Sequence, residues 1–309
     1  MALPLVTIAI PAYKAEFIQD SIKSALSQTY RNIEILIVDD CSPNKIHEKV
    51  ALFNDSRLKY IRNDKNLGMG DPSKNWNECL KYSKGEYICI LCDDDMYACN
   101  YVEELIRLAE KYPKCSAFRS SVSEIDDDGR VIDLYPLAPE HETIDEYIWH
   151  LYSGNNRQTL SEWMLKNDAL RSIGGYVNSP MAWGGDCMTV FKIAEEGGIV
   201  TSSKRMMSFR KSNINITGKE TFYIPQKILG WQMQCDCARD IIKKGDYVNS
   251  ALIIDTVEKG RKQWVKHLIK KSSLIELCKM FRNRHIYRLS YNMLFKGLFH
   301  NMMYVLHMK

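Results

Sequence analysis

The first 115 residues alternate short apolar runs with amphipathic segments, and this pattern constrains the fold more than any other feature of the chain. Strands that alternate with helices favour a mostly parallel sheet with right-handed crossovers. The apolar runs have the length of strands, and the segments between them carry apolar residues at helical spacing. The predicted strands are Leu5–Ile10, Ile33–Val38, Leu58–Ile61 and Glu86–Leu91, and the predicted helices are Glu16–Gln28, Asn75–Tyr82 and Asn100–Lys111.

The rest of the chain departs from this alternation. Two runs, Ser116–Ile125 and Arg130–Leu134, flank an Asp-Gly turn signal at residues 126–129 and predict a hairpin. A helix is expected from Asp186 to near Gly197, and the pattern after Pro225 is helical and increasingly basic. We therefore expect an α/β fold with a central sheet flanked by helices over residues 1–220, followed by a helical basic extension over residues 221–309.

The composition fits this organisation. A chain of 309 residues with 45% apolar residues can form one large α/β domain with an appendage. The ten cysteines are scattered along the chain. Cys89 and Cys92 lie three residues apart in a predicted strand, so their side chains would face opposite sides, which argues against a metal site formed by this pair. No signal peptide and no run near the ~20 apolar residues of a membrane span is evident. A cytoplasmic location is expected, with a peripheral position on the inner face of the membrane as a possible addition.

The charge is distributed unevenly. Residues 261–309 contain eleven Lys or Arg and one acid, a net charge of +10, whereas residues 1–260 carry −6. Basic residues interleaved with bulky apolar ones are typical of a helix that lies on an anionic membrane surface. The alternative is that the apolar face packs on the domain and the charges are solvated. A nucleic-acid partner is not expected, because the rest of the chain is acidic.

Three groups of residues follow predicted strands, where open parallel sheets bind ligands. The chain has neither the dinucleotide fingerprint nor a P-loop, so a glycine-rich loop does not hold phosphates. Carboxylates can hold phosphate through Mg²⁺ or Mn²⁺, which bind both. The groups are Pro11, Ala12 and Tyr13, then Asp39 and Asp40, then Asp93, Asp94 and Asp95.

Each group has a plainer alternative. The acids at 93–95 could form a solvated turn, as expected for the acids at 126–128, and adjacent strand residues face opposite sides, so all three cannot bind one metal. Asp39 and Asp40 could cap a helix or form a turn rather than bind a base or ribose. Tyr13 could stack on a base or be a half-buried aromatic residue.

Taken together, these segments resemble the family 2 glycosyltransferases of the GT-A fold. The resemblance covers roughly residues 4–215 and depends on the order and spacing of its pieces. The matching stretches are Val6-Thr-Ile-Ala-Ile-Pro-Ala-Tyr13, Ala25-Leu-Ser-Gln-Thr-Tyr-Arg-Asn-Ile-Glu34, Ile37-Val-Asp-Asp-Cys-Ser42, Asn66-Leu-Gly68, Asn75-Trp-Asn77, Gly85-Glu-Tyr-Ile88 and Asp93-Asp-Asp95.

The resemblance implies a sugar transfer, with inversion, from a nucleotide diphosphate sugar such as a UDP-sugar to an acceptor hydroxyl, in bacterial polysaccharide or glycolipid synthesis. Residues 1–115 would bind the nucleotide and residues 116–220 the saccharide or lipid-linked acceptor. Pro11–Tyr13 and the second acid of the pair, Asp40, would hold the nucleotide base, beside Asp39. Asp93 would contact the ribose or sugar, and Asp94, assisted by Asp95, would bind Mn²⁺ or Mg²⁺.

The catalytic base implied by the resemblance is Asp186, which follows Gly184-Gly185. The alternative for Asp186 is a plain helix N-cap. Trp163, Trp183 and Arg210 are expected near the acceptor pocket, although both tryptophans would also suit the core.

Three residues depart from the family pattern: Cys41, Asn44 and Cys92, the last where many members have an acid. The competing function is a non-catalytic nucleotide-sugar-binding protein.

Overall fold

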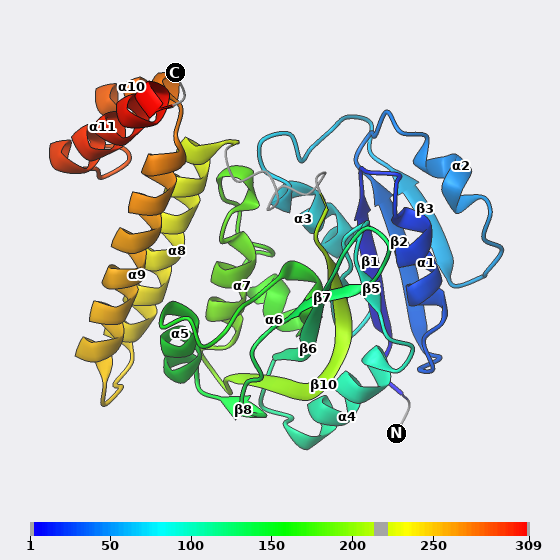
Figure 1. Cartoon of the computed structure of the whole chain (residues 1–309). Helices are drawn as coiled ribbons and strands as arrows, with labels where there is room; N and C mark the ends of the chain where they lie inside the picture. The colour runs from blue at the N-terminus through cyan, green and yellow to red at the C-terminus, as the bar shows by residue number, and fades with distance from the viewer. Residues whose placement is uncertain (1–2, 213–221, 308–309) are drawn as a thin grey trace.

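The alternating segments at the start of the chain form the parallel part of a sheet (Figure 1). The computed structural model describes residues 3–212 and 222–307. Strand β1 (Val6–Ala12) pairs in parallel with β2 (Ile33–Asp39) and β4 (Tyr87–Ile90), and β2 pairs in parallel with β3 (Leu58–Arg62). All four predicted strands are therefore confirmed to within two residues at each end.

The predicted helices between these strands are also confirmed. They are α1 (Ile18–Leu26), α3 (Ser73–Tyr82) and α4 (Tyr101–Lys111). The short helix α2 (Ile46–Val50) follows β2 and was not predicted. Residues of β1 alternate between two cores: Ile8 and Ile10 pack in the cluster that includes α1 and α4, while Ala9 packs in the cluster that includes α3. Helices thus cover both faces of the parallel strands.

Beyond β4 the sheet is mixed. Over the described residues it has ten strands, in the order β3-β2-β1-β4-β9-β6-β10-β5, with β7 on β6 and β8 on β10. The predicted hairpin is β6 (Ala117–Ile125) with β7 (Val131–Leu134). Strand β9 (Trp163–Lys166) runs antiparallel between β4 and β6. The long β10 (Ile199–Arg210) is parallel to β6, and short strands β5 (Met96–Tyr97) and β8 (His141–Glu142) run antiparallel to it.

Helices of the second half cover one side of this mixed sheet. They are α5 (Ile144–Tyr152), α6 (Asn167–Ser172) and α7 (Gly185–Ile193), with 3-10 turns at Leu160–Glu162 and Pro180–Ala182. The helix predicted from Asp186 is α7, which begins one residue earlier and ends at Ile193 rather than near Gly197. Residues of α5 and α7 share one apolar cluster with α3, so the core is continuous between the two halves.

The C-terminal extension is helical, as predicted (Figure 1). It consists of α8 (Ile224–Lys244), α9 (Ser250–Lys271), α10 (Leu274–Arg282) and α11 (Tyr291–His307). Helices α8 and α9 lie side by side along α5 and α7, and α10 and α11 pack at the far end of this pair. The predicted boundary between residues 220 and 221 lies outside the described residues, so the division of the chain remains a prediction.

Some of the apolar residues of the basic tail pack inside the extension. Leu268, Leu277 and Met280 are buried in a third cluster that also contains Ile224 and Ile228 of α8. Others, including Ile275 and Phe295, are exposed. In the part of the chain that the structure describes, no helix has the length and apolar character needed to span a membrane.

Candidate active site

The first acid of the pair after β2 is completely buried. Asp39 Oδ1 accepts a hydrogen bond from the backbone N–H of Ser42 at 2.7 Å. Its Oδ2 accepts from the Tyr60 hydroxyl at 2.5 Å and from the guanidinium of Arg62, both on β3. The bond to Ser42 makes Asp39 a turn-forming residue, and its other bonds fix the end of β2 against β3.

The second acid, Asp40, holds a distant loop. Its Oδ1 accepts from the backbone N–H of Leu67 at 2.7 Å and from the Asn63 side chain at 2.9 Å, and its Oδ2 accepts from the N–H of Gly68 at 2.8 Å. A Cβ atom on Gly68 would lie 2.8 Å from Asp40 Oδ2, so the residue at position 68 must be glycine for this approach. Asp40 therefore connects the end of β2 with residues 63–68.

The residues after β1 join this arrangement through the backbone. The carbonyl of Tyr13 accepts hydrogen bonds from the Ser42 hydroxyl and, at 3.0 Å, from the Asn44 side chain. Pro11 is half-buried and Ala12 is buried, whereas the Tyr13 side chain is 41% exposed beside the three strand ends. Asn44, one of the departures from the family pattern, thus helps to position the predicted base-binding segment.

The acids at 93–95 form a turn after β4, and their carboxylates point to different partners. Asp93 Oδ2 accepts from the backbone N–H groups of Tyr13 at 2.8 Å and Lys14 at 2.6 Å. Asp94 forms an ion pair with the Lys14 ammonium, which also lies 3.2 Å from Asp93 Oδ1. Asp95 accepts from the Ser161 hydroxyl at 2.6 Å and the Arg210 N–H at 2.9 Å. All three acids are buried, so the solvated-turn alternative is wrong for this triplet.

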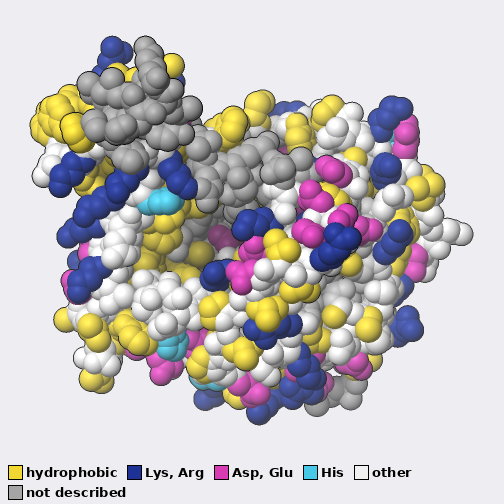
Figure 2. All heavy atoms as spheres, viewed as in Figure 1, with side chains coloured by type: hydrophobic (Ala, Val, Ile, Leu, Met, Phe, Trp, Pro, Cys, Tyr) yellow, Lys and Arg dark blue, Asp and Glu magenta, His cyan; other side chains and the backbone are white. Residues whose placement is uncertain are grey.

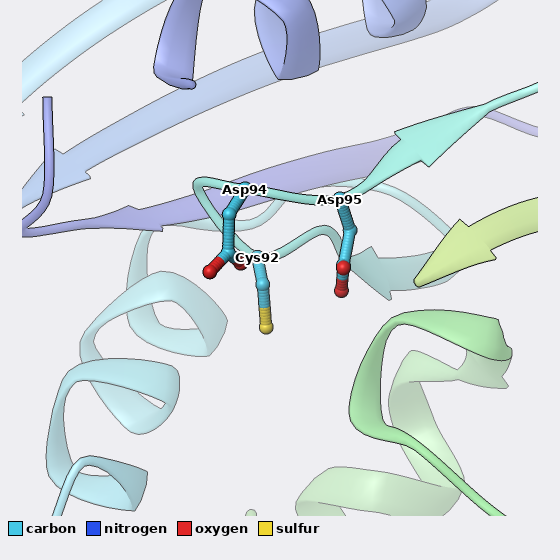
Figure 3. A group of neighbouring side chains, drawn as sticks. All are labelled: Cys92, Asp94 and Asp95. Atoms are coloured by element: carbon cyan, nitrogen blue, oxygen red, sulfur yellow. The ribbon is translucent and has the colours of Figure 1, made fainter. Parts of the chain in front are cut away.

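A divalent cation fits two of these acids (Figure 3). One ligand atom from each of Cys92, Asp94 and Asp95 lies within 4.8 Å of the others, and the three side chains extend from the same turn toward one region. Carboxylate oxygens suit Mg²⁺ and Mn²⁺, whereas a thiol is a soft ligand. Burial raises the pKa of the Cys92 thiol, which keeps it protonated. The donor chemistry therefore favours Asp94 and Asp95, the predicted pair.

The electrostatics of the turn reflect its burial. Burial raises the pKa of Asp94, although the Lys14 ammonium opposes this. The pKa of Asp95 is raised to about 8, mainly by burial and to a smaller extent by the nearby negative charge of Asp94. Burial alone would lower the pKa of Lys14, but the carboxylates of Asp93 and Asp94 raise it on balance. A cation between Asp94 and Asp95 would reduce the repulsion between these two carboxylates.

Arg210, expected near the acceptor pocket, instead supports the acidic turn. Its Nε donates to the Asp94 carbonyl at 3.0 Å, and its Nη1 donates to the carbonyls of Asp126 and Asp127 at 3.0 and 2.9 Å. The guanidinium also stacks over Phe17, 4.2 Å from the ring centre. The acids at 126–128 do form the predicted turn between β6 and β7, and Arg210 attaches that turn to the loop after β4.

Asp186 is the second residue of α7. The helix N-cap is Gly184, in a left-handed conformation with φ 74°, so the alternative that Asp186 is the N-cap is wrong. The next glycine lies close to another segment: a Cβ atom on Gly185 would be 2.6 Å from the Val177 carbonyl oxygen. Burial raises the pKa of Asp186, and the Gln158 side chain, which donates to its Oδ2 at 3.2 Å, acts in the opposite direction.

Residues 158–162 connect the two groups of acids, and the sequence did not indicate this. Gln158 contacts Asp186, and Ser161 donates to Asp95 and accepts from the backbone N–H of Cys92 at 3.0 Å. Glu162 is buried in an ion pair with Arg119 at 2.9 Å, and burial raises its pKa to about 7. The segment thus places the predicted base and the predicted metal ligands on one continuous support.

The predicted tryptophans are divided between two places. Trp163 is buried beside Tyr147 and lines a small cavity together with Asp186. Trp183 lies just before Gly184 and stacks on Trp264 of α9, with ring centres 5.3 Å apart. The extension therefore reaches the loop that precedes Asp186.

Residues 7–197 match the family described as Glycosyl transferase family 2. The chain belongs to this family. The match covers the strand ends, the acidic turn and Asp186. It ends before β10 and the extension, so Arg210 and helices α8–α11 lie outside it.

Relatives and solved structures agree with this membership. The chain is 40% identical, over 108 residues, to the UDP-Glc:alpha-D-GlcNAc-diphosphoundecaprenol beta-1,3-glucosyltransferase WfgD of Escherichia coli, covering 35% of this chain and 42% of the relative. It is 27% identical over 146 residues to the putative teichuronic acid biosynthesis glycosyltransferase TuaG of Bacillus subtilis, covering 46% of this chain and 56% of TuaG. The chain thus matches less than two thirds of the length of either relative.

The fold resembles that of S. aureus TarS, residues 1–349. The TM-score is 0.63 at 15% identity, with 86% of this chain and 73% of the TarS chain covered. A TarS structure in complex with UDP-GlcNAc matches with a TM-score of 0.62 over 87% of this chain and 72% of that chain, also at 15% identity. The similarity confirms the predicted GT-A type of fold, with its central sheet, flanking helices and C-terminal helices.

Proposed function

We propose that this protein is a metal-dependent, inverting glycosyltransferase that moves a sugar from a UDP-sugar to a hydroxyl of a saccharide or lipid-linked acceptor. The observation that carries the proposal is the connection of the acidic turn at residues 93–95 to Asp186 through residues 158–162. Family membership and the names of WfgD and TuaG support the same reaction class.

The nucleoside would bind at the ends of β1 and β2. The half-exposed Tyr13 ring is available to stack on the base, with Pro11 and Ala12 fixing the backbone beneath it. Asp39 Oδ1 and Asp40 Oδ2 each accept one hydrogen bond from the protein, so each oxygen retains capacity for a base or ribose donor. Asp93, whose carboxylate accepts a hydrogen bond from the backbone N–H of Tyr13, would contact the ribose or the sugar.

The diphosphate would lie near Asp94 and Asp95, held through Mn²⁺ or Mg²⁺. Such a cation, when bound, offsets the negative charge that develops on the leaving diphosphate. The chain itself orients the ligands: Arg210 fixes the backbone of the turn, and Ser161 fixes the Asp95 carboxylate. No glycine-rich phosphate loop is needed in this arrangement, because the carboxylates would act through the metal.

Asp186 would remove the proton from the acceptor hydroxyl as it attacks the sugar. A positioned carboxylate contributes about 10²–10⁴-fold as a general base. Gly184 and Gly185 keep the backbone before it free of side chains, and Gln158 orients its Oδ2. Attack from the face opposite the leaving diphosphate would invert the anomeric configuration.

The extension would bring the enzyme to a lipid-linked acceptor at the inner face of the cell membrane. Ile275 is 70% exposed and Phe295 is 59% exposed, on α10 and α11. Figure 2 shows hydrophobic side chains at this end of the molecule, with Lys and Arg next to them. This combination suits anionic lipid, because the apolar groups can enter the interface while the cations pair with head groups.

A transfer assay tests the proposal. UDP-sugars are offered with a saccharide or lipid-linked saccharide acceptor, in Mn²⁺ and in chelator, and the product is analysed for its linkage. We expect an inverted product in Mn²⁺ and none in chelator. A retained linkage would contradict the inverting mechanism. Donor binding without transfer to any acceptor would favour the competing function of a non-catalytic nucleotide-sugar-binding protein.

A further inference from the structure

Lys14 occupies a position between two of the predicted donor-site acids. Its ammonium pairs with Asp94 and lies 3.2 Å from Asp93 Oδ1, and its side chain is 29% exposed. We infer that Lys14 is a built-in counter-ion of the acidic turn, which holds the place of the divalent cation and is exchanged for that cation when the UDP-sugar binds. This inference rests on the proposed metal role of Asp94.

The geometry places the two cations in competition. Lys14 contacts Asp94 Oδ2, so one oxygen of this carboxylate is already paired with a cation. An ammonium and a divalent ion at one carboxylate repel each other strongly in a partly buried site. A divalent cation at Asp94 therefore binds more tightly once the Lys14 ammonium has moved away.

The backbone of Lys14 is fixed, whereas its side chain is partly exposed to solvent. The N–H groups of Tyr13 and Lys14 both donate to Asp93, which anchors the start of the side chain next to the predicted nucleoside site. Asp95, in contrast, is held by two neutral donors, the Ser161 hydroxyl and the Arg210 N–H, and keeps its place without an ammonium. The movable partner in the turn is thus Lys14.

The donor provides the reason for the exchange. A UDP-sugar brings two phosphate charges. Together with the Asp94 carboxylate, these balance the three positive charges of a divalent ion and the displaced ammonium once the donor is bound. Without the donor, Lys14 and the metal compete for the same carboxylate. Metal affinity should therefore be weak in the free protein and strong with UDP.

Binding of Mn²⁺ to the full chain tests the inference. The electron paramagnetic resonance signal of free Mn²⁺ is followed during titration of wild type, Lys14→Met and Lys14→Arg, without UDP. We expect Lys14→Met to bind Mn²⁺ at least ~10-fold more tightly than wild type, because the competing charge is gone. Lys14→Arg keeps a cation at this position and should bind as weakly as wild type.

Matched variants separate competition from other effects. Lys23→Met removes the same charge from the exposed face of α1 and should leave Mn²⁺ affinity unchanged. Asp94→Ala in the Lys14→Met background should remove the gain. If Lys14→Met fails to fold, as judged by circular dichroism, Lys14→Gln replaces it, since an amide can still donate a hydrogen bond to Asp94.

The outcomes distinguish this inference from the proposed function. In one outcome, Lys14→Met and wild type bind Mn²⁺ equally well, and UDP binding to wild type still depends on Mn²⁺. This result overturns the role of Lys14 and leaves the proposed metal-dependent transfer intact. In another outcome, wild type binds UDP with the same affinity in Mn²⁺ and in chelator. This result overturns both the role of Lys14 and the proposed metal dependence.

Discussion

The donor side of the sheet and the C-terminal extension are stabilised in opposite ways. At the strand ends the buried groups are carboxylates, and each of Asp39, Asp40 and Asp95 accepts at least two hydrogen bonds. At the far end of the extension the largest group of buried side chains is an apolar cluster that includes Leu277 and Met280. A polar network fixes directions and distances, whereas apolar packing mainly excludes water. This difference agrees with the proposed roles, in which the donor side carries the chemistry and the extension places the protein at its acceptor.

This contrast has a consequence for substitutions. A change at the strand ends leaves buried polar groups without partners, and should abolish ligand binding or turnover. A change on the exposed face of α10 or α11 should leave the donor site unaltered and affect only where the protein binds. The following predictions test whether the two regions are separable in this way.

The largest effect is expected at Asp186. Asp186→Asn keeps the shape and the Gln158 contact but cannot accept the acceptor proton, so transfer should fall by at least ~10²-fold. UDP affinity, measured by calorimetry, and vesicle binding should both remain at the wild-type level. Turnover near that of wild type would assign the base elsewhere.

The next effect concerns the metal. Asp94→Ala removes one of the two proposed carboxylate ligands and should weaken UDP binding in Mn²⁺ by at least ~10-fold, because the diphosphate loses its bridging cation. Titration of UDP into wild type and variant, each in Mn²⁺ and in chelator, measures this. Equal affinity in all four titrations would rule out the metal site.

A smaller effect is expected at the extension. Phe295→Glu and Ile275→Glu each remove an exposed apolar group and add a negative charge near anionic lipid, so binding to anionic vesicles should weaken by about 5-fold at low salt. Sedimentation with the vesicles measures it. The matched control is Leu52→Glu, which makes the same charge change at a side chain that is 68% exposed on the far side of the catalytic part.

Donor binding should be unchanged in all three variants. If wild type stays in the supernatant, the extension is a packing element. If the Leu52 variant loses as much vesicle binding as the other two, the contact does not lie on α10 and α11.

The smallest effect is a shift in pH dependence. The Gln158 hydrogen bond favours the ionised form of Asp186, whose pKa burial raises above its usual value. Gln158→Leu removes this bond and should raise the pKa further, so that the acidic limb of the kcat/KM profile moves to higher pH by a fraction of a unit to about one unit. A profile that stays in place, or moves to lower pH, would show that Gln158 does not act through Asp186.

The parallel strands and their acids could be predicted from the sequence because each signal is local. A short apolar run that ends at Asp39 or at Asp93 gives both the strand and the polar residue at its end. Strand β10 was missed because Ser202–Arg205 interrupts its apolar pattern, at the place where its pairing with β6 shifts register. Strand β9 was missed because it is only four residues long, which is too short for a clear periodic pattern.

The partners of the acids could not be predicted, because they are distant in sequence. Lys14 lies 80 residues from Asp94, and Ser161 lies 66 residues from Asp95. Adjacent residues of a strand face opposite sides, and this was the reason to expect that the acids at 93–95 could not all bind one metal. The argument does not hold for Asp94 and Asp95. These residues lie in a turn, so one oxygen of each can approach the same region.

The bridge formed by residues 158–162 limits how this enzyme can be recombined. An engineer who wants a new acceptor would be tempted to join residues 1–115 to the second half of another family member. That cut separates Asp95 from Ser161 and breaks the sheet between β4 and β9, since each of these contacts crosses the junction. A chimera has a better prospect when the native chain continues through Lys166. The foreign segment then brings its own glycine pair and base, and has to reproduce the contacts of Arg210 with the acidic turn.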